Sequence, residues 1–232
     1  MERMDFSMFE AADVANIALQ RTRHLKRWPF IGCPSYNAWL RGDPGPLHRE
    51  ARYRREQIMT GAMADISREF RVIANYLGDR KIGRMVDIGC GQGLVDILFW
   101  RKYGCHVHLV DIEHTEAMHH DYRESGAGYA SLASARRFLE SNDVPSSCIT
   151  TTNPNHGELE DSEVDLVVSM ISAGFHYPIS AYADWALRVL KPGGILMFDA
   201  RDHSDQEEQL SGFSSVEVVE KGLKHTKLAA FK

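Results

Sequence analysis

The spacing of apolar residues divides the chain into two stretches with different periods. Up to about residue 80, apolar residues recur every three or four positions, which indicates amphipathic helices. Beyond residue 80, short apolar runs of strand length alternate with helical stretches. We therefore expect a helical segment over residues 1–80 and an α/β domain over residues 81–232.

The first stretch predicts two helices with a loop between them. One helix covers Glu10–Arg27, and a longer one runs from Leu47 to Leu77, where Gly78 is placed to end it. Residues 28–46 contain four prolines and three glycines, which favour a loop. The loop either packs on a domain surface or acts as a lid over a pocket. Its aromatic side chains are Trp28, Phe30, Tyr36 and Trp39, and we take Tyr36 and Trp39 as candidate substrate contacts.

The second stretch predicts a sheet with helices on both faces. Its apolar runs lack alternation and are separated by helices, which is typical of a buried parallel sheet. The last two runs are separated by a short turn only, so they pair antiparallel. The expected strands are residues 84–90, 106–112, 148–153, 164–170, 194–200, 215–222 and 225–232, and the expected helices lie near residues 94–103, 131–142 and 179–190.

The charge of the chain is uneven. The net charge is −5, but residues 1–80 hold 13 basic and 10 acidic side chains, against 14 and 22 in the remainder. Nucleic-acid binders usually carry a much stronger basic face than this net +3 segment, so we do not expect a nucleic-acid partner.

The cysteines and the hydropathy of the chain indicate the cellular compartment to expect. The four cysteines form no CxxC pair, which argues against a zinc site and a disulfide framework and favours reduced thiols in the cytoplasm. The first residues carry acids and no apolar region, so we expect no secretory signal. No apolar run reaches the roughly 18 residues of a spanning helix, so we expect no membrane partner.

Three glycines at alternate positions follow the first expected strand, in the stretch VDIGCGQG (86–93). Glycine permits positive φ angles and lets a ligand approach the backbone closely. The dinucleotide pattern G-x-G-x-x-G is not met, because position 94 is leucine, and the Lys-Ser/Thr pair of a P-loop is absent. A ligand with an adenosine but no phosphate fits better.

These residues, with three further stretches, carry a family resemblance. Residues 84–232 resemble the class I S-adenosylmethionine-dependent methyltransferases through VDIGCGQG (86–93), HVHLVDI (106–112), VDLVVSM (164–170) and LKPGGILMFDAR (190–201). The resemblance implies a Rossmann-like seven-stranded sheet, parallel except for one strand, with helices on both faces and the N-terminal helical segment as a cap. It also implies S-adenosylmethionine as cofactor and S-adenosylhomocysteine as product.

The resemblance assigns roles to several polar residues. Asp111 ends the second strand, where a carboxylate accepts the ribose hydroxyls. Asp87 either orients the glycine turn or the methionine amino group, or is a structural acid satisfied by backbone amides. Asn153 aligns with the position that meets the adenine amine. The expected cofactor-binding residues are Asp87, Gly89, Cys90, Gly91, Gly93, Asp111, Ile112, Asn153 and Ser169.

The chemistry at the methyl group depends on the stretch SMISAGFHYP (169–178). It lacks the D/N-P-P-Y/F motif of the methyltransferases that modify adenine or glutamine amides, which argues against those acceptors. His176 is the candidate general base, since imidazole titrates near neutral pH. Alternatively, it only shapes the pocket or caps the next helix. Further candidate substrate contacts are Tyr177 and, in the segment 119–132, Tyr122, Arg123 and Tyr129.

His106 and His108 share one face of a strand and suggest either a metal site or a solvated face; we expect no metal.

The leading hypothesis is a cytoplasmic methyltransferase for a small molecule, such as a sugar or another hydroxyl compound, with residues 1–80 selecting the acceptor. An RNA or protein methyltransferase is the alternative, because residues 48–57 are rich in arginine. A non-catalytic interaction module is the third hypothesis. The sequence leaves the oligomeric state open.

Overall fold

The computed structural model describes residues 4–26, 32–113, 130–159, 163–202, 204 and 208–232. Trp28, Phe30 and the segment with Tyr122, Arg123 and Tyr129 lie outside these ranges. The chain divides into two compact units, Met1–Glu69 and Phe70–Lys232. The boundary falls inside a helix, whereas the sequence pattern places it after that helix.

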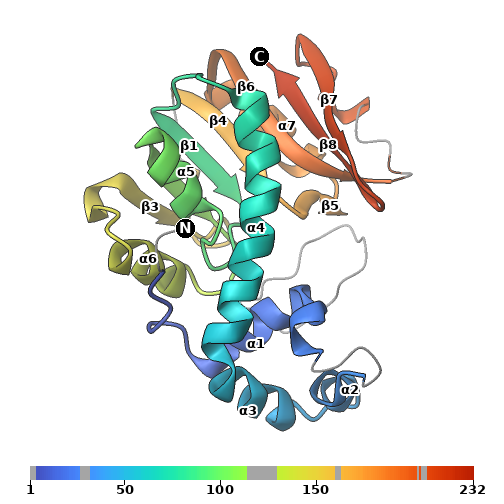
Figure 1. The fold of residues 1–232 in the computed structure, drawn as a ribbon. Helices are drawn as coiled ribbons and strands as arrows, with labels where there is room; N and C mark the ends of the chain where they lie inside the picture. The colour runs from blue at the N-terminus through green and yellow to red at the C-terminus, as the bar shows by residue number, and fades with distance from the viewer. Residues whose placement is uncertain (1–3, 27–31, 114–129, 160–162, 203, 205–207) are drawn as a thin grey trace. The chain divides into compact units, whose positions relative to one another are not determined.

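The first unit is helical, as predicted. In helix α1, Glu10 and Asp13 form a capping box in which the Glu10 N–H donates to Asp13 Oδ2 at 2.9 Å. α1 packs against α3, and the apolar face of α4 contributes the fully buried Ile58, Met59 and Met63. The elements are α1 (Ala11–Gln20), a 3₁₀ turn (Thr22–Leu25), α2 (Pro34–Leu40), α3 (Gly45–Tyr53) and the first part of α4 (Arg55–Leu77) (Figure 1).

Three predictions for this unit are wrong in detail. The helix expected over Glu10–Arg27 ends at Gln20, because Arg21 leaves helical geometry at φ −131° and ψ 57°. The expected loop contains α2, because Pro34 occupies the first turn of a helix, where a missing N–H costs nothing. The expected single helix from Leu47 is interrupted at Arg54, which leaves helical geometry at φ −113° and ψ 20°. The Arg54 guanidinium pairs with Glu50 and donates to the His24 carbonyl at 3.1 Å, so Arg54 links α3 to the 3₁₀ turn.

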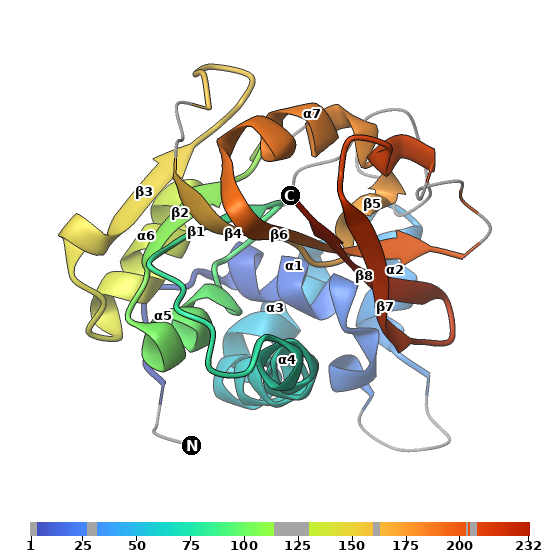
Figure 2. The same ribbon diagram turned by 90° about the horizontal axis from the view of Figure 1, so that it is seen from above.

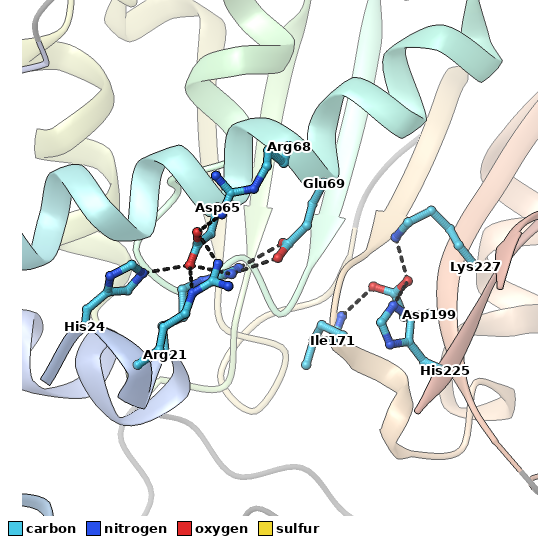
Figure 3. Close-up of polar contacts among 10 residues, drawn as sticks. Arg21, His24, Asp65, Arg68, Glu69, Ile171, Asp199, His225 and Lys227 are labelled. Atoms are coloured by element: carbon cyan, nitrogen blue, oxygen red, sulfur yellow. Dashed lines mark hydrogen bonds and ion pairs between the residues drawn. The ribbon is translucent and has the colours of Figure 1, made fainter. Parts of the chain in front are cut away.

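Asp65 on α4 is the polar centre of this unit (Figure 3). It is 3% exposed. Arg23 Nε donates to Asp65 Oδ2 at 2.6 Å, His24 Nε2 lies 2.7 Å from the same oxygen, and Arg68 pairs with Oδ1. Burial opposes ionisation, but the hydrogen bonds from Arg23 and His24 hold the pKa of Asp65 below its usual value.

The second unit contains the predicted sheet, with strand order β3-β2-β1-β4-β6-β8-β7 in the described residues. β8 is antiparallel to both of its neighbours, β6 and β7, and the remaining pairs are parallel. The prediction of a seven-stranded sheet with one antiparallel strand is therefore confirmed. The strands are β1 (Arg84–Ile88), β2 (His106–Val110), β3 (Ile149–Thr152), β4 (Val164–Ser169), β6 (Leu190–Arg201), β7 (Ser215–Lys221) and β8 (His225–Phe231).

Helices cover both faces of this sheet, with α7 on one face and α5 on the other (Figure 2). Phe70 at the start of the second unit meets Phe99 of α5 edge-on, with ring centroids 4.9 Å apart. The other face is buried by Ala183 and Ala186 of α7. Short 3₁₀ turns cover Ser146–Cys148 and Glu208–Leu210, and the helices are α5 (Asp96–Tyr103), α6 (Leu132–Ser141) and α7 (Ser180–Val189).

The segment after β4 differs from the prediction. The stretch after the fourth expected strand, for which no element was predicted, forms a further strand, β5 (Ser172–Tyr177), which lies beside β6. Gly174 has φ +92°, and a Cβ atom there would stand 2.4 Å from Phe198 Cδ2 of β6. The close approach of the two strands at this point requires glycine.

Candidate cofactor and acceptor site

The three glycines form the turn from β1 to α5, and all three have positive φ angles. A Cβ atom at Gly89 would stand 1.9 Å from Ser172 Oγ, and one at Gly93 would stand 2.8 Å from Leu139 Cδ1. A Cβ atom at Gly91 would meet nothing within 4 Å. Gly89 and Gly93 therefore serve packing, and Gly91 faces the open side of the turn.

Asp111, directly after β2, is tied to this turn. Its Oδ2 accepts the N–H of Gly91 at 3.0 Å, and its Oδ1 accepts the N–H of Glu113 at 2.8 Å. It is 9% exposed. The carboxylate is thus fixed by backbone donors at the carboxyl edge of the parallel strands, where ligands of α/β sheets bind.

Asn153, after β3, closes the same edge. Its Nδ2 donates to the Ile112 carbonyl at 3.2 Å and to Glu113 Oε2 at 3.1 Å. Glu113 has a positive φ of 58°, and its Oε1 accepts the N–H of Leu132 at 3.1 Å. Glu113 thus connects β2, β3 and the start of α6, a role that the sequence analysis did not assign to it.

Asp87 lies in β1 behind the glycine turn, and the structure adds a second acid, Asp96, at the start of α5. They are 2% and 0% exposed. Burial, the negative charge of Asp96 and that of Asp111 raise the pKa of Asp87 well above its usual value. Burial also raises the pKa of Asp96, to about 7. The two carboxyl groups are close enough to share a hydrogen bond once one of them is protonated.

Asp87 Oδ1, both oxygens of Asp96 and Gln92 Nε2 are buried without a hydrogen-bond partner. The neighbouring Cys90 is 8% exposed, and burial with these carboxyl groups raises the pKa of its thiol well above the usual value. Cys90 is therefore a neutral thiol within the turn. At least one oxygen of Asp87, Oδ1, is therefore not satisfied by a backbone amide.

Ser169 at the end of β4 is fully buried, and its hydroxyl donates to the Ile88 carbonyl at 3.1 Å. The hydroxyl thus joins β4 to β1. Ser172 Oγ and Tyr177 OH, at the two ends of β5, lie 3.4 Å apart. Burial raises the pKa values of Tyr177 and of its neighbour Tyr182, and the Asp111 charge raises both further. Neutral hydroxyl groups therefore stand near Asp111.

His176 belongs to β5, next to an aromatic and cationic cluster. The Phe175 ring meets the His176 ring at 5.0 Å and the His225 ring at 6.0 Å, both edge-on. The Arg201 guanidinium lies 5.3 Å from the centre of the Phe175 ring. Arg201 and His225 are paired residues of β6 and β8, so the strands bring together side chains that are far apart in sequence.

The candidate acceptor contacts Tyr36 and Trp39 lie on α2 of the first unit. Their rings stack with centroids 6.0 Å apart. Tyr177 lies on β5 of the second unit, and Tyr129 lies outside the described residues.

The two histidines of β2 are engaged by the neighbouring strand. His108 Nε2 lies 2.8 Å from Thr152 Oγ1, and His106 Nε2 lies 3.2 Å from Thr150 Oγ1. His108 is 3% exposed, so the interpretation as a solvated face is wrong for it. Within the described ranges no cluster of metal-ligating side chains occurs. All four cysteines are free thiols.

Two open depressions lie at the opposite edge of the sheet, where the parallel strands begin. One is lined by Tyr76, Arg80 and Phe231 among others, and the other by residues 78–83 with Lys102 and Tyr103. Asp111 and the glycine turn lie at the other edge, where the parallel strands end and ligands bind in α/β sheets, so these depressions are not the candidate site. No helix of the described chain is both long enough and apolar enough to cross a membrane.

Comparisons with known proteins bear on the family and the fold of the chain. A family model described as a methyltransferase domain matches residues 51–223. A search of the curated proteins finds no significant match.

Three solved structures share the fold. A T. thermophilus 16S rRNA N2 G1207 methyltransferase, in complex with AdoMet and guanosine, is 18% identical with a TM-score of 0.52, over 70% of this chain and 41% of that one. A methyltransferase from Pyrococcus furiosus is 18% identical with a TM-score of 0.51, over 72% of this chain and 82% of that one. A candidate O-methyltransferase from Nostoc punctiforme is 13% identical with a TM-score of 0.53, over 100% of this chain and 74% of that one. The chain thus spans about two fifths of the length of the rRNA enzyme.

Proposed function

Since the chain belongs to the methyltransferase domain family, whose fold is that of the class I S-adenosylmethionine-dependent enzymes, we propose that it methylates a small-molecule acceptor, at a hydroxyl group. The observation that carries the proposal is Asp111, which is fixed beside a glycine turn whose middle residue, Gly91, faces open space. The absence of the D/N-P-P-Y/F motif supports an acceptor other than a nucleobase amine.

The residues present fit the cofactor. The Asp111 carboxylate is held by backbone donors at the place where ribose hydroxyls bind in this fold. Asp87 and Asp96 leave buried oxygens without partners, a condition that costs free energy until a donor arrives. An ammonium group is such a donor. Asp111 would hold the ribose, and the carboxyl pair would attract the amino group of the methionine part.

The bound cofactor supplies a methyl group on a sulfonium, which is an excellent leaving group. The chain itself then has to orient the acceptor and exclude water. A hydroxyl acceptor also has to lose a proton as the new bond forms. We propose that His176 accepts this proton, supported by its position in β5 beside Tyr177, whose hydroxyl meets Ser172 at the glycine turn.

Cofactor binding is tested by thermal denaturation with S-adenosylhomocysteine. Ligand at about 100 times its dissociation constant adds about 2.7 kcal/mol to the free energy of unfolding, a shift of a few degrees. Asp111→Ala should abolish the shift, and Asp184→Ala, at an exposed acid of α7, should keep it. No shift in the wild type would mean that the site is closed or inactive and would favour the non-catalytic interaction module.

The role of His176 is tested by turnover once an acceptor is found. His176→Gln should lower kcat by about 10²-fold or more, because a positioned base contributes that much. His156→Gln, at an exposed histidine, is the matched control. An unchanged kcat in His176→Gln would remove this side chain from the proton transfer.

We also propose that the helical segment over residues 1–80 selects the acceptor. Tyr36 and Trp39 provide a stacked aromatic pair there. The double substitution Tyr36→Ala and Trp39→Ala should raise the KM for the acceptor and leave the shift with S-adenosylhomocysteine intact. An unchanged KM would mean that the second unit alone chooses the acceptor.

An RNA acceptor is the second candidate, favoured by the arginines of residues 48–57. Arg54 is used internally by Glu50 and the 3₁₀ turn, but Arg49 and Arg52 are exposed. Binding of RNA that weakens steeply with salt, and weakens further in Arg49→Gln with Arg52→Gln, would favour this candidate. Binding that is absent at low salt would exclude it.

A further inference from the structure

Arg201 ends β6 at the same edge of the sheet as Asp111, and its charge has no counter-ion among the described residues. Its Nη1 is buried without a hydrogen-bond partner. The guanidinium packs on the Phe175 ring at 5.3 Å, which fixes its plane and uses none of its donors. A buried guanidinium N–H without an acceptor costs more than an unpaired neutral donor.

The nearest acid on the strand, Asp199, is fully engaged by other groups (Figure 3). Its Oδ1 accepts from Lys227 Nζ at 2.5 Å and lies 3.5 Å from His225 Nε2. Its Oδ2 accepts the N–H of Ile171 at 3.1 Å. Asp199 is 1% exposed and both of its oxygens have partners, so its carboxylate is not available as a counter-ion for Arg201.

In this cluster Lys227 and His225 both face Asp199, and Asp202, next to Arg201, is exposed. The buried Nη1 of Arg201 remains without a partner. Arg201 and His225 flank the Phe175 ring, whose other neighbour is His176, the residue that we propose as base. Ile171, which helps to hold Asp199, has a positive φ of 50°, a strained backbone of the kind that clusters at ligand sites.

We propose that Arg201 forms an anion subsite for the methyl acceptor, so that the acceptor carries a carboxylate or a phosphate group besides the group that is methylated. The guanidinium fork matches the paired oxygens of either anion. The inference rests on the proposed function, because it identifies the chemical class of that acceptor.

The first test measures anion binding without any methyl transfer. Malonate and inorganic phosphate are titrated calorimetrically, at constant ionic strength, into the full chain saturated with S-adenosylhomocysteine. We expect wild-type dissociation constants of about 1–10 mM for one of the two anions, since a small ion makes few contacts. Which anion binds identifies the acceptor group as carboxylate or phosphate.

Variants locate the binding. Arg201→Gln should weaken it by about 10- to 100-fold, the range for a charged hydrogen bond, and Arg201→Lys should restore part of it. Arg188→Gln, at an exposed arginine of α7, should bind the anion as the wild type does. Binding of S-adenosylhomocysteine should be the same in all three variants, which also shows that they fold.

The second test uses acceptors in matched pairs, each a hydroxyl compound with a free carboxylate or phosphate and its neutral ester or alcohol. Wild type should prefer the charged member, and Arg201→Gln should lose that preference. Equal anion binding in wild type and Arg201→Gln, or no anion binding in a wild type that binds S-adenosylhomocysteine, would overturn the subsite and leave the proposed function standing. Failure to bind S-adenosylhomocysteine would instead refute the proposed function itself.

Discussion

Asp65 in the first unit and Asp87 in the second are both almost completely buried, at 3% and 2% exposure, yet their surroundings are opposite. Asp65 is surrounded by Arg23, His24 and Arg68, and its pKa is lowered. Asp87 faces the acids Asp96 and Asp111, and its pKa is raised. Burial by itself raises the pKa of both carboxyl groups. The charges of the neighbouring side chains decide whether the net shift is upward or downward.

The difference separates a structural acid from one that awaits a ligand. The Asp65 carboxylate has all its partners within the chain, so ionisation stabilises the fold. The Asp87 and Asp96 pair keeps oxygens without partners at the edge where ligands bind, and perturbed acids of this kind are typical of functional sites. Four experiments test this contrast.

The largest effect is expected from Asp65→Asn. The substitution leaves several cations around an amide that cannot neutralise them, and breaking a buried pair costs about 3–5 kcal/mol. We expect about 2–3 kcal/mol, because Arg23 and Arg68 are more than half exposed and hydrated. Hydrogen exchange of the α1 and α4 amides measures the loss in the first unit.

The pKa of Asp65 also determines how the stability of the first unit changes with pH. A lowered pKa in the folded state gives stability that is present above about pH 4, the unfolded value, and is lost as the pH falls further. The Asn variant should lack this loss. Equal acid sensitivity in both proteins would mean that Asp65 is not the group responsible.

The next effect is expected from Asp96→Asn. Its pKa is raised from 3.8 to about 7, so the folded state of the wild type holds a proton that the unfolded state gives up. The stability of the second unit should therefore fall by about 1–3 kcal/mol between pH 4 and pH 7.5. Asp96→Asn should flatten this fall, as measured by urea unfolding across the range. A slope that persists would assign it to other groups.

A smaller effect concerns the cofactor. Because ionisation of the carboxyl pair provides charge for the ammonium group, which S-adenosylmethionine and S-adenosylhomocysteine share, affinity for both ligands should rise about 3- to 10-fold from pH 6 to pH 8. Calorimetric titration of both ligands measures the two affinities. Asp96→Asn should remove the pH dependence, and pH-independent affinities in the wild type would place the pair away from the amino group.

The smallest effect is expected from Glu69→Gln, next to Asp65. Glu69 forms two hydrogen bonds with Arg21, at 2.7 and 2.9 Å, but its side chain is 38% exposed. Exposed pairs contribute about 0.2–1 kcal/mol, so we expect about 0.5 kcal/mol. A loss as large as that in Asp65→Asn would show that the contact with Arg21, and not burial, governs this cluster.

The sequence predicts the glycine turn and the strand that ends before Asp111, because each depends on residues close together in the chain. The hydrogen bond from the Gly91 N–H to Asp111 joins the ends of two strands and appears only in the structure. Helix α2 is missed because prolines usually interrupt helices. Pro34, however, lies in the first turn of α2, where a helix tolerates proline. The break at Arg54 is missed because apolar spacing continues across it.

Other features depend on contacts between distant residues. Asp96 looks like an ordinary acid in the first turn of a helix until β1 places Asp87 beside it. Arg201 belongs to a stretch that the resemblance includes, but its packing on Phe175 and the engagement of Asp199 by Lys227 appear only when β5, β6 and β8 are assembled. Strand β5 is missed because Gly174 interrupts its pattern.

The place of β8 in the sheet sets an order of events during synthesis. β7 leaves the ribosome before β8, yet its pairing partner in the sheet is β8. Without residues 225–231, β7 has no pairing partner and β6 has an open edge. A form of the chain in which β8 has not yet paired is therefore more prone to aggregation than the folded protein.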